Sequence, residues 1–105
     1  MELLRTELVK GKPPVLQVIG EIDLSTVDDL RTAMEDAMAA DPTVVVDMGG
    51  VTFIDAVGLR AVLALAATRN GVGPLNLVNA PRVTWLLDVV GLADLPSIVI
   101  RGEGE

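Results

Sequence analysis

The chain has 105 residues, half of them hydrophobic, and a formal net charge of −7 at pH 7. It contains no cysteine and no histidine, which excludes disulfides, thiol nucleophiles and imidazole general bases. The acidic balance opposes binding to nucleic-acid backbones and anionic membranes, and the single Phe and single Trp leave little for bases to stack on. No apolar run reaches the roughly 20 residues of a membrane span, and the amino end does not resemble a signal peptide. We therefore expect one cytoplasmic domain over residues 1–105, with no cofactor, no metal, no nucleic-acid partner and no membrane insertion.

The first third of the chain predicts a hairpin and a helix. Residues 3–9 (LLRTELV) have the mixed pattern of an edge strand, a turn rich in Gly and Pro follows, and residues 15–19 (VLQVI) form a second strand. Ser25 and Thr26 each have an aspartate three residues later, which is the capping-box pattern of a helix start. The expected buried stripe of this helix consists of Val27, Leu30, Met34, Ala37 and Met38.

Helices and strands then alternate. Asp41 and Pro42 end the helix, and the β-branched run at residues 43–48 (TVVVDM) predicts a strand covered on both faces. A helix is expected from about Gly58 to Arg69, and a short strand at residues 75–78. The last helix is expected to start at Pro81 and to end at Gly91. Its apolar stripe consists of Val83, Leu86, Leu87 and Val90. A final strand covers residues 97–100. The order β-β-α-β-α-β-α-β predicts an α/β fold with a mixed, largely parallel sheet and helices packed against it.

A candidate site lies where the strand ending in Phe53 and Ile54 gives way to a helix. Asp55 has the type and position of a helix N-cap that accepts from the N–H of Val57 or Gly58. Strand-to-helix junctions carry the sites of many α/β proteins, but this one has no hydroxyl, thiol or imidazole and no glycine-rich phosphate loop. We therefore do not expect an enzyme.

Asp23 stands at a second strand-to-loop junction and would lie beside Asp55 if the two strands are neighbours. Paired carboxylates are compatible with acid/base chemistry or a divalent cation, but a solvated loop charge is the favoured interpretation because no third ligand is evident.

Two further features concern surfaces. In the helix after Asp55, the residues facing the core are expected to be Leu59, Val62, Leu63 and Ala66, and the opposite face carries Arg60, Ala61, Ala64, Leu65 and Thr68. That opposite face is small and partly apolar, which fits either the helix propensity of alanine or a surface approached closely by another protein. Trp85 lies just off the core stripe of its helix, so it either packs at the rim or anchors an interface, and packing is the favoured interpretation.

Three segments together resemble the anti-sigma factor antagonists of the STAS domain family: residues 20–26 (GEIDLST), 44–59 (VVVDMGGVTFIDAVGL) and 81–92 (PRVTWLLDVVGL). The resemblance covers nearly the whole chain and implies a mixed sheet packed by helices. It also implies a partner, an anti-sigma factor of the serine-kinase type, which on binding frees its sigma factor. In such proteins the kinase phosphorylates the hydroxyl residue directly after the motif aspartate.

By motif position, Asp55 matches that aspartate, Gly58 and Leu59 match the following pair, and Ala56 occupies the phosphoacceptor position. The resemblance therefore implies that the partner is bound through Asp23, Thr26, Asp55, Ala56, Val57, Gly58, Leu59, Arg60, Ala61 and Ala64.

The chain departs from the family pattern in four places. Ala56 cannot be phosphorylated and Val57 offers no substitute. Arg60 replaces a residue that is usually small, and Trp85 stands where a basic residue is common. The usual final helix is expected to be absent, since the given sequence ends in RGEGE. We expect binding to survive without the ordinary phosphorylation switch.

Three alternatives stay open. Phosphorylation could fall on Ser25, Thr26 or Thr52, although the first two are expected to cap a helix. The domain could be a STAS scaffold or regulatory module that docks another protein, such as a transporter subunit. It could also bind a small ligand or nucleotide at the strand-to-helix junction. The identity of the sigma factor and the oligomeric state are not predicted.

Overall fold

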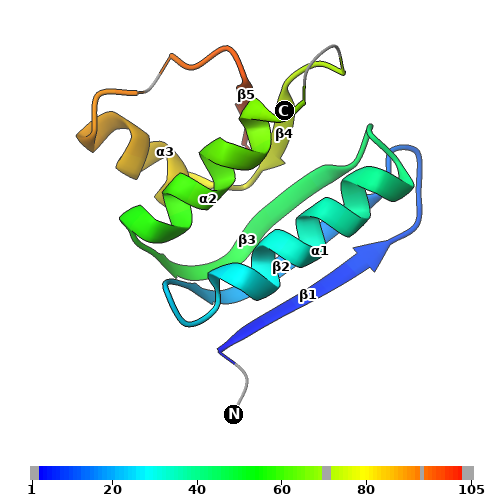
Figure 1. Ribbon diagram of the computed structural model, residues 1–105, viewed down its shortest axis with the longest axis horizontal. Coiled ribbons are helices and arrows are strands. Elements are labelled where there is room, and N and C mark those ends of the chain that lie inside the picture. Colours follow the sequence, from blue (N-terminus) through cyan, green and yellow to red (C-terminus); the bar gives the residue numbers. More distant parts are fainter. Residues whose placement is uncertain (1–2, 70–71, 93, 103–105) are drawn as a thin grey trace.

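The computed structural model describes residues 3–69, 72–92 and 94–102 (Figure 1). The last three residues of the tail, 103–105, lie outside this part of the chain. The elements in chain order are β1 (Leu4–Val9), β2 (Val15–Ile22), α1 (Val27–Ala40), β3 (Val45–Ile54), α2 (Ala56–Ala67), β4 (Leu75–Val78), α3 (Pro81–Val89) and β5 (Ile98–Arg101). This order confirms the one that hydrophobic patterning predicts.

The strands form one five-stranded sheet in the order β1-β2-β3-β4-β5. β1 pairs antiparallel with β2, and the other three pairs are parallel, which confirms the predicted hairpin and mixed sheet. Each β-α-β crossover steps in the same direction across the sheet, so right-handed connections place all three helices on one face. Figure 1 shows α1 and α2 lying side by side along that face.

The hydrophobic core lies between the sheet and the helical layer. Alternate residues of β2 and β3 point into it, and each helix contributes one stripe. The stripe predicted for α1 is confirmed: Val27, Leu30, Met34 and Ala37 are buried, and Met38 is half-buried. Asp41 and Pro42 follow directly after the last residue of α1, as expected.

The prediction that β3 is covered on both faces is wrong. Val44, Val46 and Met48 are buried, whereas Val45 and Asp47 between them are half-buried. The reason is topological, because all helices lie on one face and leave the other face of the sheet uncovered. β3 also runs on through two glycines to Ile54, so it is longer than expected.

Three predictions about helix faces need correction. Ala61 and Leu65 of α2 are buried rather than outward-facing, because α2 lies between α1 and α3 and both of its flanks are covered. Trp85 does not pack at the rim of the core, since 64% of its surface is exposed. Val90, expected on the core stripe of α3, follows the end of that helix and is exposed.

Candidate partner-binding site

The site is built where β2 and β3 end. Their parallel register pairs Ile22 with Ile54, so the next residues, Asp23 and Asp55, leave the sheet side by side. A backbone hydrogen bond of 3.3 Å from the N–H of Asp55 to the carbonyl of Ile22 joins the two exits. This confirms the expected juxtaposition of the two aspartates.

Asp55 is the N-cap of α2, as predicted. Its backbone is extended, and its Oδ1 accepts a hydrogen bond of 3.0 Å from the N–H of Gly58. The cap satisfies one of the free donors at the helix start and makes Ala56 the first helical residue. α2 therefore begins two residues earlier than expected.

Gly58 lets the first turn of α2 rest directly on the two strand ends. A Cβ atom at this position would lie 2.5 Å from Cγ2 of Ile22 and 3.0 Å from Cγ1 of Ile54, closer than side chains approach. Only glycine fits such a close approach. The position of Asp55 and Ala56 relative to the sheet thus depends on the absence of a side chain at residue 58.

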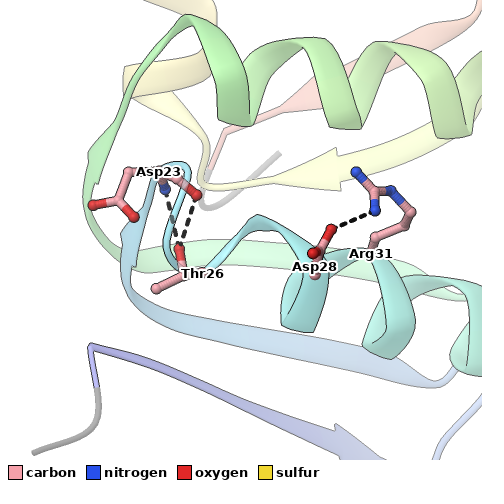
Figure 2. Close-up of polar contacts among 4 residues, drawn as sticks. All are labelled: Asp23, Thr26, Asp28 and Arg31. Atoms are coloured by element: carbon pink, nitrogen blue, oxygen red, sulfur yellow. Dashed lines mark hydrogen bonds and ion pairs between the residues drawn. The ribbon is translucent and has the colours of Figure 1, made fainter.

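The turn after β2 is held by Asp23 and Thr26 (Figure 2). The hydroxyl of Thr26 accepts from the N–H of Asp23 at 3.0 Å and donates to the carbonyl of Glu21 at 2.8 Å. The Asp23 carboxylate accepts from the hydroxyl of Ser25 at 2.6 Å and from its N–H at 2.9 Å. The side-chain hydrogen bond from Ser25 lowers the pKa of Asp23; desolvation opposes this effect, and hydrogen bonds from the backbone of Ser25 and from Thr26 add to it.

The capping-box prediction for this turn is wrong. Thr26 is the N-cap of α1 by position, but its side chain makes no capping hydrogen bond. The hydroxyls of Ser25 and Thr26 instead form hydrogen bonds within the turn that precedes the helix. Ser25 donates to the carboxylate of Asp23, and Thr26 donates to the carbonyl of Glu21. Thr26 is only 5% exposed, so it supports the loop from inside.

The residues predicted to bind a partner fall into two groups. The exposed or half-buried members are Asp23, Asp55, Ala56, Val57, Arg60 and Ala64. The buried members, which support this surface from below, are Thr26, Gly58, Leu59 and Ala61. We call the first group the α2 face.

Two exposed apolar residues at this end of the sheet were missed. Leu24, in the turn between the aspartate and the serine, is 77% exposed, and Phe53 lies exposed two residues before Asp55. The sequence offered a signal for each: Leu24 is an apolar residue inside a polar turn, and Phe53 is the only phenylalanine and lies close to the motif aspartate. Leu24 adds apolar area beside Asp23, whereas Phe53 alternates with the buried Ile54 along β3 and so lies on the sheet face that the helices leave uncovered.

The described residues contain no group of three or more acidic side chains, histidines or cysteines able to hold a metal ion. A cavity of about 710 Å³ lies elsewhere, between α3 and the ends of β4 and β5. Its lining residues are Gly49, Asn79, Ala80, Pro81, Thr84, Leu87, Asp88, Leu95, Ile98, Ile100, Arg101 and Gly102. None of the predicted site residues borders it. No helix in the described part of the chain is long and apolar enough to cross a membrane.

Comparison with known proteins identifies the class. A family model described as "Mlab, STAS domain" matches residues 7–100. The chain therefore belongs to the STAS domain family, as the three sequence segments suggested.

The relatives found in sequence are two records of the anti-sigma-F factor antagonist RsfB, from Mycobacterium tuberculosis strains CDC 1551 / Oshkosh and ATCC 25618 / H37Rv. Each is 42% identical over 60 residues, which is 56% of this chain and 47% of RsfB. The matched region thus spans about half the length of these curated relatives.

Two solved structures show the same fold. An anti-sigma factor antagonist from Mycobacterium paratuberculosis superposes with a TM-score of 0.76 at 24% identity, over 93% of this chain and 85% of that one. The anti-sigma factor antagonist SpoIIAA in its unphosphorylated form gives a TM-score of 0.65 at 24% identity, over 95% of this chain and 89% of that one.

Proposed function

We propose that this STAS domain is an anti-sigma factor antagonist that binds an anti-sigma factor of the serine-kinase type and so frees a sigma factor. The observation that carries the proposal is the capped start of α2, with Asp55 beside the Asp23 turn, in a chain 42% identical over 60 residues to an anti-sigma-F factor antagonist. The domain acts by binding and performs no chemistry of its own.

The α2 face suits close docking. Ala56 and Ala64 present methyl groups, so a partner backbone can approach the helix closely, while Leu24 adds exposed apolar area in the turn after Asp23. Asp23, Asp55 and Arg60 add charges at its margin, where charged groups set orientation and specificity more than affinity.

Ala56 makes the usual switch impossible on this surface. A phosphoryl group there would add about −1.5 to −2 charges, directly beside Asp55, and the methyl group of alanine cannot accept one. We propose that binding is constitutive and that control passes to the amount of protein. The bonded and buried hydroxyl of Thr26 is a poor acceptor, whereas Ser25 and Thr52 are exposed.

The test uses the purified chain and a serine-kinase anti-sigma factor. Titration calorimetry should show a complex, and incubation with the kinase and ATP should leave both the intact mass and the affinity unchanged. Ala56→Asp should abolish binding by placing a charge on the α2 face. Ala39→Asp is the matched control, since Ala39 is exposed near the end of α1 that lies away from Asp55. Phosphate added to Ser25 or Thr52 of the wild-type chain would contradict the proposal that binding is constitutive.

One observation favours a second function, the binding of a small ligand, although at the cavity beside α3 and not at the junction before α2 where the sequence suggested it. The cavity beside α3 has a volume within the roughly 300–1,000 Å³ of ligand pockets, and charged Asp88 and Arg101 line it. Calorimetry with nucleotides tests this alternative, and the absence of heat would eliminate nucleotides as the ligand.

A pull-down that recovers transporter subunits and no kinase would instead favour the scaffold function.

A further inference from the structure

The exposure of Trp85 calls for a functional explanation. It is the only tryptophan of the chain, and 64% of its surface is in contact with solvent. Trp85 lies two residues from both Val83 and Leu87, which are buried in the core, so it projects from the opposite side of α3. Core packing therefore does not account for this side chain.

Trp85 is part of an apolar surface. Val89 is 60% exposed and lies one turn later on the same side of the helix. We call Trp85 and Val89 the α3 patch. Large apolar side chains concentrated on one exposed surface are typical of protein interaction sites, and tryptophan is enriched among interface residues that dominate affinity.

Backbone hydrogen bonds end α3 directly after the patch. Gly91 has a positive φ of 78°, and its N–H donates to the carbonyl of Asp88 at 3.2 Å. The N–H of Leu92 reaches back to the carbonyl of Leu87 at 2.8 Å. This pair of bonds is a Schellman motif, which ends the helix and turns Leu92 back along it. Val89 is therefore the last residue of a helix whose end is fixed by backbone hydrogen bonds.

The α3 patch faces the same side of the molecule as the α2 face. Leu59 and Val62 of α2 enter the same core cluster as Val83 and Leu87 of α3, from the same side of the sheet. The residues opposite these stripes therefore point away from the sheet on both helices. Because α2 and α3 pack against each other, one partner can contact both surfaces.

The charges around the patch indicate the kind of surface it fits. Asp88 is exposed between Trp85 and Val89 along the helix, and the basic neighbour Arg82 donates its Nε to the carbonyl of Val51 in β3 at 3.2 Å, which holds its guanidinium toward that strand. A second copy of this chain, also carrying −7, would bring like charges together. We propose that Trp85 and Val89 insert into an apolar pocket of the same anti-sigma factor that binds the α2 face, and that the rim of this pocket is basic. This inference rests on the proposed function.

The test measures binding of the full chain to the serine-kinase anti-sigma factor by titration calorimetry. Trp85→Ala should weaken the affinity by about 30-fold or more, as expected for the loss of an anchor residue, and Trp85→Phe should restore part of it. Val89→Ala should weaken the affinity several-fold. The matched control is Val72→Ala, at a valine that is 54% exposed outside the patch, and it should leave the affinity unchanged. Thermal unfolding checks that each variant is folded.

The basic rim is tested separately. Affinity should fall as salt increases, and Asp88→Asn should reduce both the affinity and its salt dependence. An unchanged salt dependence would contradict the basic rim.

Other outcomes separate this inference from the proposed function. If Ala56→Asp abolishes binding while Trp85→Ala and Val89→Ala bind like the wild type, the α3 patch is not an anchor and only this inference fails. If the wild-type chain does not bind at all, the proposed function fails. If sedimentation equilibrium shows a dimer that Trp85→Ala dissociates, the patch contacts a second copy and the inference is overturned.

Discussion

Replacing Gly58 by alanine tests how closely the first turn of α2 rests on the sheet. In an ordinary helix position this change would stabilise the protein by about 1 kcal/mol, because alanine is the better helix former. Here the new Cβ would lie 2.5 Å from Cγ2 of Ile22 and 3.1 Å from the carbonyl oxygen of the same residue. The isoleucine could shift, but the backbone oxygen cannot move without disturbing the pairing of β2 and β3.

Whether Gly58→Ala stabilises or destabilises the protein depends on the balance between the cost of overpacking and the gain in helix propensity. Overpacking a close-packed core costs about 1–3 kcal/mol, and the contact at residue 58 is short enough to take the upper part of that range. After subtraction of about 1 kcal/mol for helix propensity, Gly58→Ala should lower the free energy of unfolding by about 1–2 kcal/mol. It should also weaken partner binding, since α2 has to move away from the strand ends.

Urea unfolding followed by circular dichroism measures this change. Ala64→Gly is the matched control in the same helix, because Ala64 is exposed and the change reports helix propensity without any contact with the sheet; it should cost about 1 kcal/mol. A Gly58→Ala variant more stable than the wild type would refute the close approach of α2 to the strands.

Three further changes probe the supports of the site. Asp55→Ala should lower the free energy of unfolding by about 1 kcal/mol through loss of the N-cap, and Asp55→Asn should retain most of it; equal losses in denaturant unfolding would contradict the capping role. The pKa of Asp23 is lowered in the folded protein by the hydrogen bond from Ser25, so its contribution to stability is present above the unfolded-state pKa and is lost as pH falls through the lower folded-state pKa. Carboxyl-carbon NMR should show this pKa rising in Ser25→Ala, and no change would refute the assignment. Arg69 is 8% exposed and its guanidinium donates to two backbone carbonyls at 2.8 and 3.3 Å, so Arg69→Ala should cost about 1–3 kcal/mol in thermal or denaturant unfolding, and a neutral substitution would show that these bonds add nothing.

Much of the fold could be predicted because its signals are local. The N-cap at Asp55 needs only a carboxylate three residues before a free N–H, so residue type and position were sufficient. The order of strands and helices followed from hydrophobic periodicity. The juxtaposition of Asp23 and Asp55 stayed conditional on β2 and β3 being neighbours, and the structure shows that they are.

The errors concern features that depend on distant neighbours. A run of β-branched residues reads as a strand buried on both faces, but the number of covered faces is decided by the direction of the crossovers. Ala61 and Leu65 are buried because α1 and α3 pack against the two flanks of α2. The periodicity of α2 alone gives no information about these neighbouring helices. Ser25 and Thr26 resemble helix caps by pattern, yet the carboxylate and carbonyl of the preceding turn compete successfully for their hydroxyls.

The measurement that tests the central claim most directly is the restoration of a hydroxyl at residue 56. Ala56→Ser is incubated with the serine-kinase anti-sigma factor and ATP, and both intact mass and affinity are measured. We predict that this variant gains one phosphate on residue 56 and then loses its partner, while the wild-type chain gains none and stays bound. A variant that is never phosphorylated, or that binds equally well with the phosphate in place, would contradict the account of the α2 face as a kinase-binding surface whose phosphoacceptor has been replaced by alanine.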